Sequence, residues 1–469
     1  MKAFGWIALA ALLACDRPPE VPTVEAGEKA QQPAPAAHTD ARSLCQDGIG
    51  ALLGSLREPA EVVLYTMRSE PSISAFTDRV AGVLARFKAL SKGKLVYRIV
   101  DAKTTEDRGL VVRYRGVEEA LPILDPDIAR GVEFVIAKKL REARDRGDDK
   151  LATIGVVTKK DEVALSEANL VVGVATANLR KITQDAFPYY RFEDVDLKSD
   201  IPADALIITQ PGKDYGDEEL RRIDAFVMRG GALAVFASAV NLAPADPSLE
   251  ATLDAHRLDG LLAKYGVDMQ IASVLDARAG LMVPLGGGHP PNVTLRVPSI
   301  VHVDQQAATV DSDSPIFFRL EELAVPFASP LLPHGERQPD AKLSVLLQSS
   351  PDASTNDAAR QKVQFGAASP ARKQRHVLAV ALEGRLKSAF GDTRSAANAR
   401  LLVVSSSQFL ANPYARAIKS GSADPDLEAR ATHYTKKFLT GTILAFKNVL
   451  DWMTNDTRVN ACSGLPLAP

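Results

Sequence analysis

The chain has 469 residues, 56 of them Lys or Arg and 58 Asp or Glu, and 46% of all residues are hydrophobic. This globular composition excludes wholesale disorder, and the formal net charge of -2 argues against a dedicated nucleic-acid binder, which normally shows a basic face. Three cysteines exclude a disulfide-rich scaffold, but their odd number requires an explanation.

The first residues predict a secreted, lipidated protein. Lys2 precedes 12 apolar residues, which are too few to cross a bilayer, because a spanning helix needs about 20. A basic start and a short apolar run are typical of a signal peptide. The run ends in Leu-Leu-Ala before Cys15, which resembles a bacterial lipobox, where the signal is cut before a cysteine that becomes lipidated. We therefore expect a signal peptide over 1–14 and a lipid on Cys15.

A Pro-rich segment follows the anchor. Residues 15–44 hold five prolines and no aromatic side chain, so they cannot bury enough apolar surface to offset the entropy of ordering them. The sequence predicts an extended tether here, rising about 3 Å per residue. Asp16, next to the lipidated cysteine, favours retention at the inner membrane in some bacteria. We expect a cell-envelope protein that is lipid-anchored at the inner membrane and faces the periplasm.

The first α/β domain is predicted over 45–149. An apolar strand at 61–65 is followed by apolar residues at helical spacing over 76–90 and by a second strand at 95–100. This β-α-β order implies a mostly parallel sheet. A hairpin and a further helix follow, at 109–114, 118–123 and 132–140.

A charged run marks the predicted domain boundary. Lys138 and Lys139 begin a mixture of both charge signs that continues over 141–150. Such a run is more often a solvated helix end than a partner site, and the sequence favours the solvated helix end.

The second domain is predicted over 150–469 as a doubly wound α/β sheet. The clearest unit is a buried strand at 204–209, a helix capped by Asp217, a Gly-Gly stop, and a strand at 232–236. A loop-rich β insertion is expected at about 276–385. A final helix places Trp452 on its apolar face, so that side chain is expected in the core. After residue 14 no uninterrupted apolar run approaches the length of a membrane span.

Segments spread from Ser55 to Val459 carry a family resemblance, through their order rather than through a single motif. These segments are 58–65, 87–101, 205–210, 217–231, 258–267 with 274–276, 325–329, 346–351, 377–386 and 448–453. In this order they resemble GldG-like auxiliary proteins of gliding-motility-associated ABC transporters, with their ABC-type uncharacterised transport system domain.

The resemblance implies a fold and a role. It implies that the second domain is similar to glutamine-amidotransferase-like folds that have lost catalysis, and that the permease and ATPase of an ABC transporter are partners. Two features depart from the family. Its members usually have transmembrane helices, whereas this chain has an expected lipid anchor. They also tend to carry an acidic Gly-Asp-Ser segment where this chain has Ser405-Ser406-Ser407.

The chain lacks several catalytic and metal-binding motifs. There is no Walker A motif, so this is not the ATPase, and the glycine run 286–288 is interpreted as a plain loop. No Gly-x-Ser-x-Gly sequence exists. The seven histidines are scattered, and even the closest two, His289 and His302, are too far apart in sequence to form a local pair of metal ligands. We expect no metal and no cofactor, and the sequence identifies no ligand-binding residue.

The remaining cysteines lie near the two ends of the folded region. Cys45 and Cys462 are far from the middle of the sheet, where a cysteine nucleophile on a strand-to-helix turn would stand. A thiol-dependent enzyme is therefore not expected. In an oxidising periplasm the two thiols could instead form a disulfide. The alternative, two independent thiols, stays open.

Three functional hypotheses follow. The leading one is a non-enzymatic periplasmic-side lipoprotein subunit that binds or scaffolds beside an ABC transporter of the gliding-motility or envelope-transport type. The second is an envelope lipoprotein that binds glycan or peptidoglycan, based on the tether and the loop-rich insertion. The third is a hydrolase on an amidotransferase-like sheet, which requires Asp, Ser and His side chains that converge in one pocket.

Overall fold

The structure is a computed structural model. It describes residues 35–467 except 105–106, 123, 125, 127–128, 168, 285–292, 364–371 and 419–423, with side chains described from residue 41 on. Residues 41–469 form one compact unit that does not include 1–40. The expected signal peptide at 1–14, the expected lipid site Cys15 and the glycine run 286–288 lie outside the described residues.

Helix α2 (Pro35–Gly54) begins inside the predicted tether. The expected extended segment therefore does not reach residue 44. Helix α2 can begin at Pro35, because proline is well tolerated in the first turn of a helix. The later turns bury Cys45, Ile49 and Leu53 in the first core, and this burial stabilises a helix that the Pro-rich composition alone does not predict.

The first sheet has the order β2-β1-β3-β4. Its elements are β1 (Ala60–Thr66), α3 (Pro71–Leu90), β2 (Leu95–Asp101), β3 (Gly109–Tyr114), β4 (Val117–Pro122) and α4 (Val132–Gly147). β1 and β2 are parallel, as the β-α-β order predicts. The pairs β1–β3 and β3–β4 are antiparallel, so the parallel pairing expected for this sheet is confined to one pair. A hairpin connection cannot join parallel strands.

One core covers one face of this sheet. Alternate strand residues such as Val62, Leu64 and Val112 pack with apolar residues of α2, α3 and α4. The same core contains Val459, Cys462 and two leucines from the end of the chain. Residues near both termini of the compact unit thus share one core, which the sequence pattern does not reveal.

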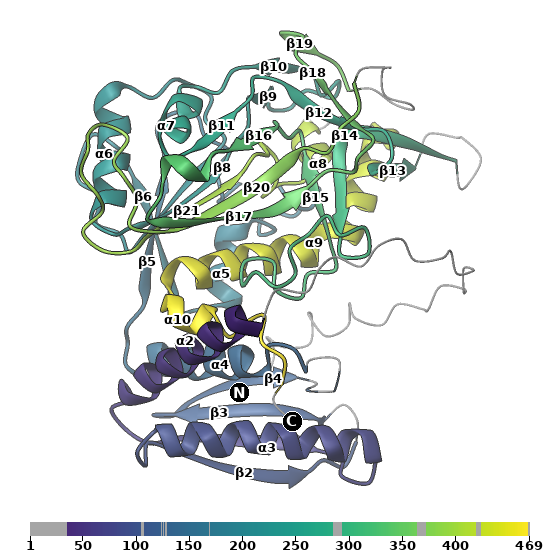
Figure 1. The fold of residues 1–469 in the computed structure, drawn as a ribbon. Coiled ribbons are helices and arrows are strands. Elements are labelled where there is room, and N and C mark those ends of the chain that lie inside the picture. The colour runs from purple at the N-terminus through teal and green to yellow at the C-terminus, as the bar shows by residue number, and fades with distance from the viewer. Residues whose placement is uncertain are drawn as a thin grey trace. The chain divides into compact units, whose positions relative to one another are not determined.

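In the described residues, nine strands form the central sheet, in the order β11-β16-β20-β21-β8-β7-β5-β6 with β17 paired to β20 (Figure 1). Five adjacent strands at one end of this order are parallel: β6 (Tyr190–Val195), β5 (Ala152–Val157), β7 (Ala205–Thr209), β8 (Ala232–Phe236) and β21 (Ala399–Val404). Antiparallel strands complete it: β11 (Val267–Met269), β16 (Leu331–Pro333), β17 (Ala341–Gln348) and β20 (Val377–Gly384). The predicted α/β class with a mostly parallel central sheet is confirmed.

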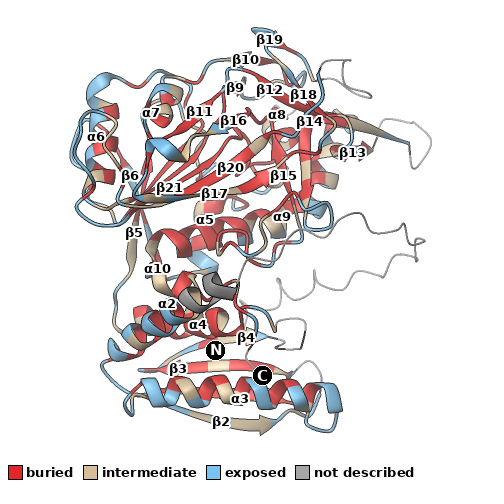
Figure 2. Ribbon diagram, in the orientation of Figure 1, coloured by how far each residue is buried: buried red, intermediate tan, exposed pale blue. Residues whose placement is uncertain are grey.

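Helices cover both faces of the central sheet. α5 (Leu179–Ala186) and α9 (Pro425–Thr454) pack on one face with Ala205 and Ile207. α6 (Asp217–Met228) and α7 (Leu258–Lys264) pack on the other with Leu206 and Ile208. Because both faces are covered, all five residues of β7 and all five of β8 are buried. Strands of the central sheet such as β8 and β20 are largely coloured as buried in Figure 2. The helix cap differs from the prediction, since Gly216 is the N-cap of α6 and Asp217 is its first residue.

The stretch expected as an insertion at 276–385 is divided between small separate sheets and the central sheet. Part of it forms small sheets with neighbouring strands, and part supplies β16, β17 and β20 to the central sheet. The small sheets contain β9 (Val240–Leu242), β10 (Ala251–Leu253) and β19 (Arg360–Gln361); β12 (Ser273–Asp276) and β18 (Ala353–Asn356); and β13 (Gly280–Pro284), β14 (Thr294–Asp304) and β15 (Glu322–Pro326).

The remaining helices are short. They are η3 (Gly335–Arg337), α8 (Pro413–Ala417) and α10 (Thr457–Asn460). Trp452 is buried in the core, as predicted. Within the described part of the chain, no helix combines the length and the apolar character that crossing a membrane requires.

Candidate functional site

Open α/β sheets carry their ligand sites beyond the carboxyl ends of the parallel strands. In this chain, polar side chains follow β7, β8 and β21 at that edge: Gln210, Ser238 and Ser405, all buried. Donors and acceptors left available at this edge would mark a ligand site.

The chain itself uses these polar groups. Gln210 Oε1 accepts a hydrogen bond from the Ser238 backbone N–H at 2.8 Å, and Gln210 Nε2 donates to Asn241 Oδ1 at 2.6 Å. Ser238 Oγ donates to the Phe327 carbonyl at 2.8 Å, and Ser405 Oγ donates to the Ser329 carbonyl at 2.6 Å. The strand ends are thus joined to one another and to the loop after β15. These three side chains hold the edge together, whereas Thr209 Oγ1 and Ser407 Oγ at the same edge are buried without a hydrogen-bond partner.

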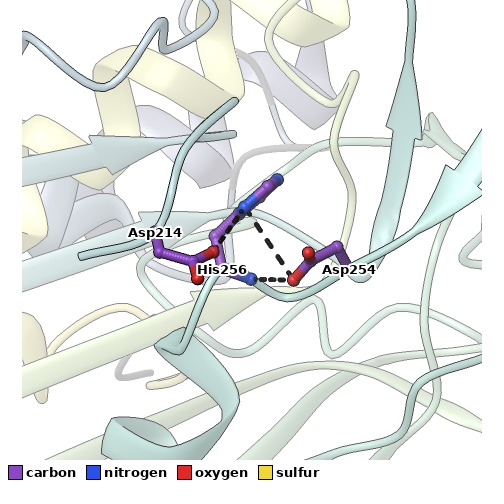
Figure 3. A group of neighbouring side chains, drawn as sticks. All are labelled: Asp214, Asp254 and His256. Carbon is purple, nitrogen blue, oxygen red and sulfur yellow. Dashed lines mark hydrogen bonds and ion pairs between the residues drawn. The ribbon is translucent and has the colours of Figure 1, made fainter. Parts of the chain in front are cut away.

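A second group lies just outside this edge, where three side chains from two loops converge (Figure 3). Asp214 comes from the loop between β7 and α6, and Asp254 and His256 come from the loop between β10 and α7. His256 Nδ1 lies 3.0 Å from Asp214 Oδ1 and 3.8 Å from Asp254 Oδ1. The aspartates are exposed (63% and 57% of the side chain), and the histidine is largely covered (12%).

Hydrogen bonds fix the backbone of the second loop, and one of them joins it to the first. The Asp254 N–H donates to the Ala239 carbonyl at 2.7 Å, and Asn241 Nδ2 donates to the Asp254 carbonyl at 2.7 Å. The Tyr215 N–H donates to the His256 carbonyl at 3.3 Å. Since Asn241 also bonds to Gln210, the cluster rests directly on the buried network at the strand ends. Its three side chains therefore start from a fixed backbone.

The backbone at His256 is unusual. His256 has φ 51° and Arg257 has φ 68°, in the left-handed region that few residues other than glycine adopt. Arg257 donates to the Tyr215 carbonyl at 2.9 Å and forms an ion pair with Asp217. This conformation turns the histidine ring back toward Asp214 (Figure 3).

The cluster bears on two sequence predictions. The expected absence of a local histidine pair says nothing about His256, because its partner Asp214 lies 42 residues away. A sequence signal did exist, since Asp214 follows a predicted buried strand by a few residues. In the described part of the chain, the His256 ring hydrogen-bonds to Asp214 and to no Ser, Thr or Cys side chain, so a Ser-His-Asp arrangement is not assembled there.

Cys45 and Cys462 form a disulfide in the structure, with Cα atoms 5.0 Å apart. The bond joins α2 to the segment that follows α10, inside the first core. Of the pairings that the sequence left open, the structure thus contains the bridge. Cys15 lies outside the described residues.

Up to Asp145, the charged run at the predicted domain boundary is not a solvated helix end, and only its last part, with Arg146, Asp149 and Lys150, is exposed. Arg141, Glu142 and Asp145 are buried, and Lys138 Nζ lies 2.6 Å from Asp451 Oδ2 of α9. The prediction was wrong because several partners of these charges stand in α9, near the end of the chain, where no local pattern shows them.

The α4–α9 charge cluster, defined here as Lys138, Glu142, Lys447 and Asp451, has strongly shifted pKa values. Burial lowers the pKa of Lys138 to about 8, against the attraction of Asp451. Burial alone would raise the pKa of Glu142, but Lys447 and Lys139 lower it to about 2. Lys447 contacts both carboxylates and lies 2.7 Å from Asp451 Oδ2. The cluster connects α4, beside the first sheet, to α9, beside the central sheet.

Comparison with solved structures gives only low similarity. The chain is similar to the mmIFT52 N-terminal domain, with 13% identity and a TM-score of 0.35, covering 65% of this chain and 98% of that one. It is also similar to a ThuA-like protein of Parabacteroides merdae, with 10% identity and a TM-score of 0.28, covering 65% and 90%.

Sequence comparison is more informative. Over 397 residues the chain is 22% identical to an uncharacterized protein of Borreliella burgdorferi, covering 77% of this chain and 74% of the relative. Residues 152–439 match the family described as an ABC-type uncharacterized transport system. This match begins at β5, ends inside α9 and includes every strand of the central sheet. Since it spans more than half of the sequence, the chain belongs to this family, as an auxiliary component of an ABC-type transport system.

Proposed function

We propose that the chain is a non-enzymatic lipoprotein subunit, anchored through Cys15 on the periplasmic side of the inner membrane. It acts as a binding or scaffolding component beside the permease and ATPase of an ABC transporter of the gliding-motility or envelope-transport type. The observation that carries the proposal is the family match over 152–439.

The disulfide supports the proposed compartment. Bridges such as Cys45–Cys462 form and persist in oxidising surroundings and are rare in reducing ones. A periplasmic location agrees with this chemistry and with the signal-peptide pattern before Cys15.

The strand-end network supports a non-enzymatic role. A catalytic site on such a sheet needs side chains that are available to a substrate at the carboxyl edge. Gln210, Ser238 and Ser405 instead bond to the chain's own backbone and to Asn241. Coupling of the two sheets through the α4–α9 charge cluster suits a scaffold that holds its partners in a fixed geometry.

Crosslinking in the native host tests the partner assignment. A photo-crosslinking amino acid is placed at an exposed position, Leu332 or Ile271, near the β11 edge of the central sheet. We expect crosslinks to an ABC permease or ATPase, identified by mass spectrometry. The same amino acid at buried Val235 is the control and should give none. Recovery of neither transporter subunit from any exposed position would overturn the proposal.

Fractionation tests the anchor separately. Cys15→Ala should release the chain from the membrane fraction into the periplasmic fraction, while Cys45→Ala, which also removes one thiol, should leave it on the membrane. A Cys15→Ala chain that stays in the membrane fraction would contradict the lipid anchor without touching the transporter assignment.

A further inference from the structure

The two carboxylates of the exposed cluster approach the same ring nitrogen. Asp214 Oδ1 lies 3.0 Å and Asp254 Oδ1 3.8 Å from His256 Nδ1. A ring nitrogen carries at most one hydrogen, so it can donate to only one of these acceptors. The two distances show that this acceptor is Asp214, because the separation from Asp254 is too long for a hydrogen bond. Asp254 Oδ1 instead accepts a hydrogen bond from the His256 backbone N–H at 2.8 Å, so the ring hydrogen serves Asp214 alone.

The other histidines of the described region that contact carboxylates are arranged differently. At His334, Asp268 lies 3.2 Å from Nε2 and Glu336 lies 3.1 Å from Nδ1, so each carboxylate has its own nitrogen. His302 contacts a single carboxylate, Glu322, through Nε2 at 2.7 Å. Those are ordinary histidine ion pairs. Convergence on one nitrogen sets His256 apart from them.

We propose that Asp214, Asp254 and His256 bind one divalent transition-metal ion of the Zn²⁺ type. The ion takes the place of the Nδ1 hydrogen and is shared by both carboxylates. Ligand atoms of the three residues lie within 4.8 Å of one another. Ligands at about 2.0–2.2 Å from a central zinc need only small side-chain shifts to meet from these positions. One imidazole nitrogen and two carboxylate oxygens form a zinc donor set that leaves a fourth position for water or an external ligand.

Electrostatics favours the ion. Two exposed carboxylates lie close together, and the guanidinium of the adjacent Arg257 binds Asp217 and the Tyr215 carbonyl. A divalent cation would cancel both negative charges in one step. The preorganised backbone of the two loops reduces the conformational entropy that binding costs.

Bound metal would join the β7–α6 loop to the β10–α7 loop, just outside the carboxyl edge of the parallel strands. The open coordination position then faces solvent, because both aspartates are exposed. The site can accept an oxygen or nitrogen ligand from a partner protein. This inference does not depend on the proposed transporter role.

Isothermal titration of the full-length protein without a polyhistidine tag, in detergent micelles with Zn²⁺, tests the site. We expect one Zn²⁺ per chain. Asp214→Asn and His256→Ala should each weaken binding by about tenfold or more. His334→Ala is the matched control, since it also removes a histidine between two carboxylates, and it should leave the affinity unchanged.

Thermal unfolding of each variant without metal shows whether a loss of zinc binding results from misfolding. Asp214→Asn is nearly isosteric and should unfold at the wild-type temperature, so its loss of zinc is not a folding defect. The inference is overturned if wild type binds no Zn²⁺, if His256→Ala binds as well as wild type, or if His334→Ala loses affinity equally. Equal affinity for Mg²⁺ and Zn²⁺ would also overturn it, because it would mean that only the two carboxylates bind the ion and that the imidazole of His256 is not a ligand.

Discussion

At the residue scale, Gly131 shows how closely the end of the chain packs on α4. It is the N-cap of α4 with φ 77°, and its N–H donates to the Leu465 carbonyl at 2.9 Å. A Cβ at this position would lie 2.5 Å from the Phe318 ring and 2.7 Å from the Ser463 carbonyl oxygen. No side chain fits there without moving the C-terminal segment.

Gly131→Ala should therefore destabilise the fold by more than backbone strain alone. Gly116 is the matched control, because it has φ 78° and no atom within 4 Å of its added Cβ. We expect about 1–2 kcal/mol from Gly116→Ala, for the left-handed conformation, and a further 1–3 kcal/mol or so from Gly131→Ala, for the clash. Urea unfolding measures both, and equal losses would contradict the steric argument.

The sequence predicts single residues correctly only where the residues beside them in the chain determine their structure. The apolar run at 204–209 predicts a buried strand, and β7 is buried at all five positions. The exposed cluster could not be predicted in the same way, because Asp214 and His256 meet only through the packing of two loops. The left-handed conformation of both His256 and Arg257 could not be predicted either, since residues other than glycine adopt it in only a few per cent of cases.

At the scale of elements, the α4–α9 charge cluster joins two helices that lie far apart in the sequence. Glu142→Gln removes the carboxylate that faces Lys447 and leaves that ammonium buried with one counter-charge fewer. Breaking a buried pair from one side costs about 3–5 kcal/mol. Glu118→Gln, which breaks an exposed pair with Arg113, should cost less than about 1 kcal/mol. Denaturant midpoints of the two variants compare these costs, and similar values would refute the buried role.

The same cluster predicts a pH dependence in the alkaline range. Burial lowers the pKa of Lys138 to about 8, whereas the ordinary value is 10.5. Between these values the unfolded chain binds more protons at this site, so the stability of wild type rises with pH relative to Lys138→Met. The gain is at most about 3 kcal/mol and is complete near pH 10.5. Unfolding of both proteins at pH 7 and pH 10 tests it, and a constant difference between them would contradict the lowered pKa.

At the scale of the whole molecule, the sequence predicts that helices cover a central sheet, but it does not predict which strands belong to that sheet. The strands at 331–333, 341–348 and 377–384 lie in the loop-rich stretch that the sequence assigns to an insertion, yet they extend the central sheet. Pairing is decided by long-range contacts, such as Val380 opposite Val403, which alternation along one strand cannot specify.

The disulfide closes the compact unit as a whole. Cys45 and Cys462 are 417 residues apart in sequence, so the bridge restricts almost the entire unfolded chain. In the chain-entropy model, a loop of this length stabilises the fold by about 6 kcal/mol, while measured bridges commonly give about 2–4 kcal/mol. The apolar residues on either side of Cys462, Val459 and Leu465, already pack in the first core, so the folded state should keep its geometry without the bond.

A variant with both Cys45→Ser and Cys462→Ser should therefore fold but unfold at a lower urea concentration than oxidised wild type. Dithiothreitol should move the wild-type midpoint toward that of the variant and leave the variant unchanged. Cys15→Ser, which removes a thiol outside the bridge, should keep the oxidised midpoint. If the reduced and oxidised wild type unfold at the same urea concentration, the first core alone holds the C-terminal segment in place, and the bridge contributes nothing to the stability of the fold.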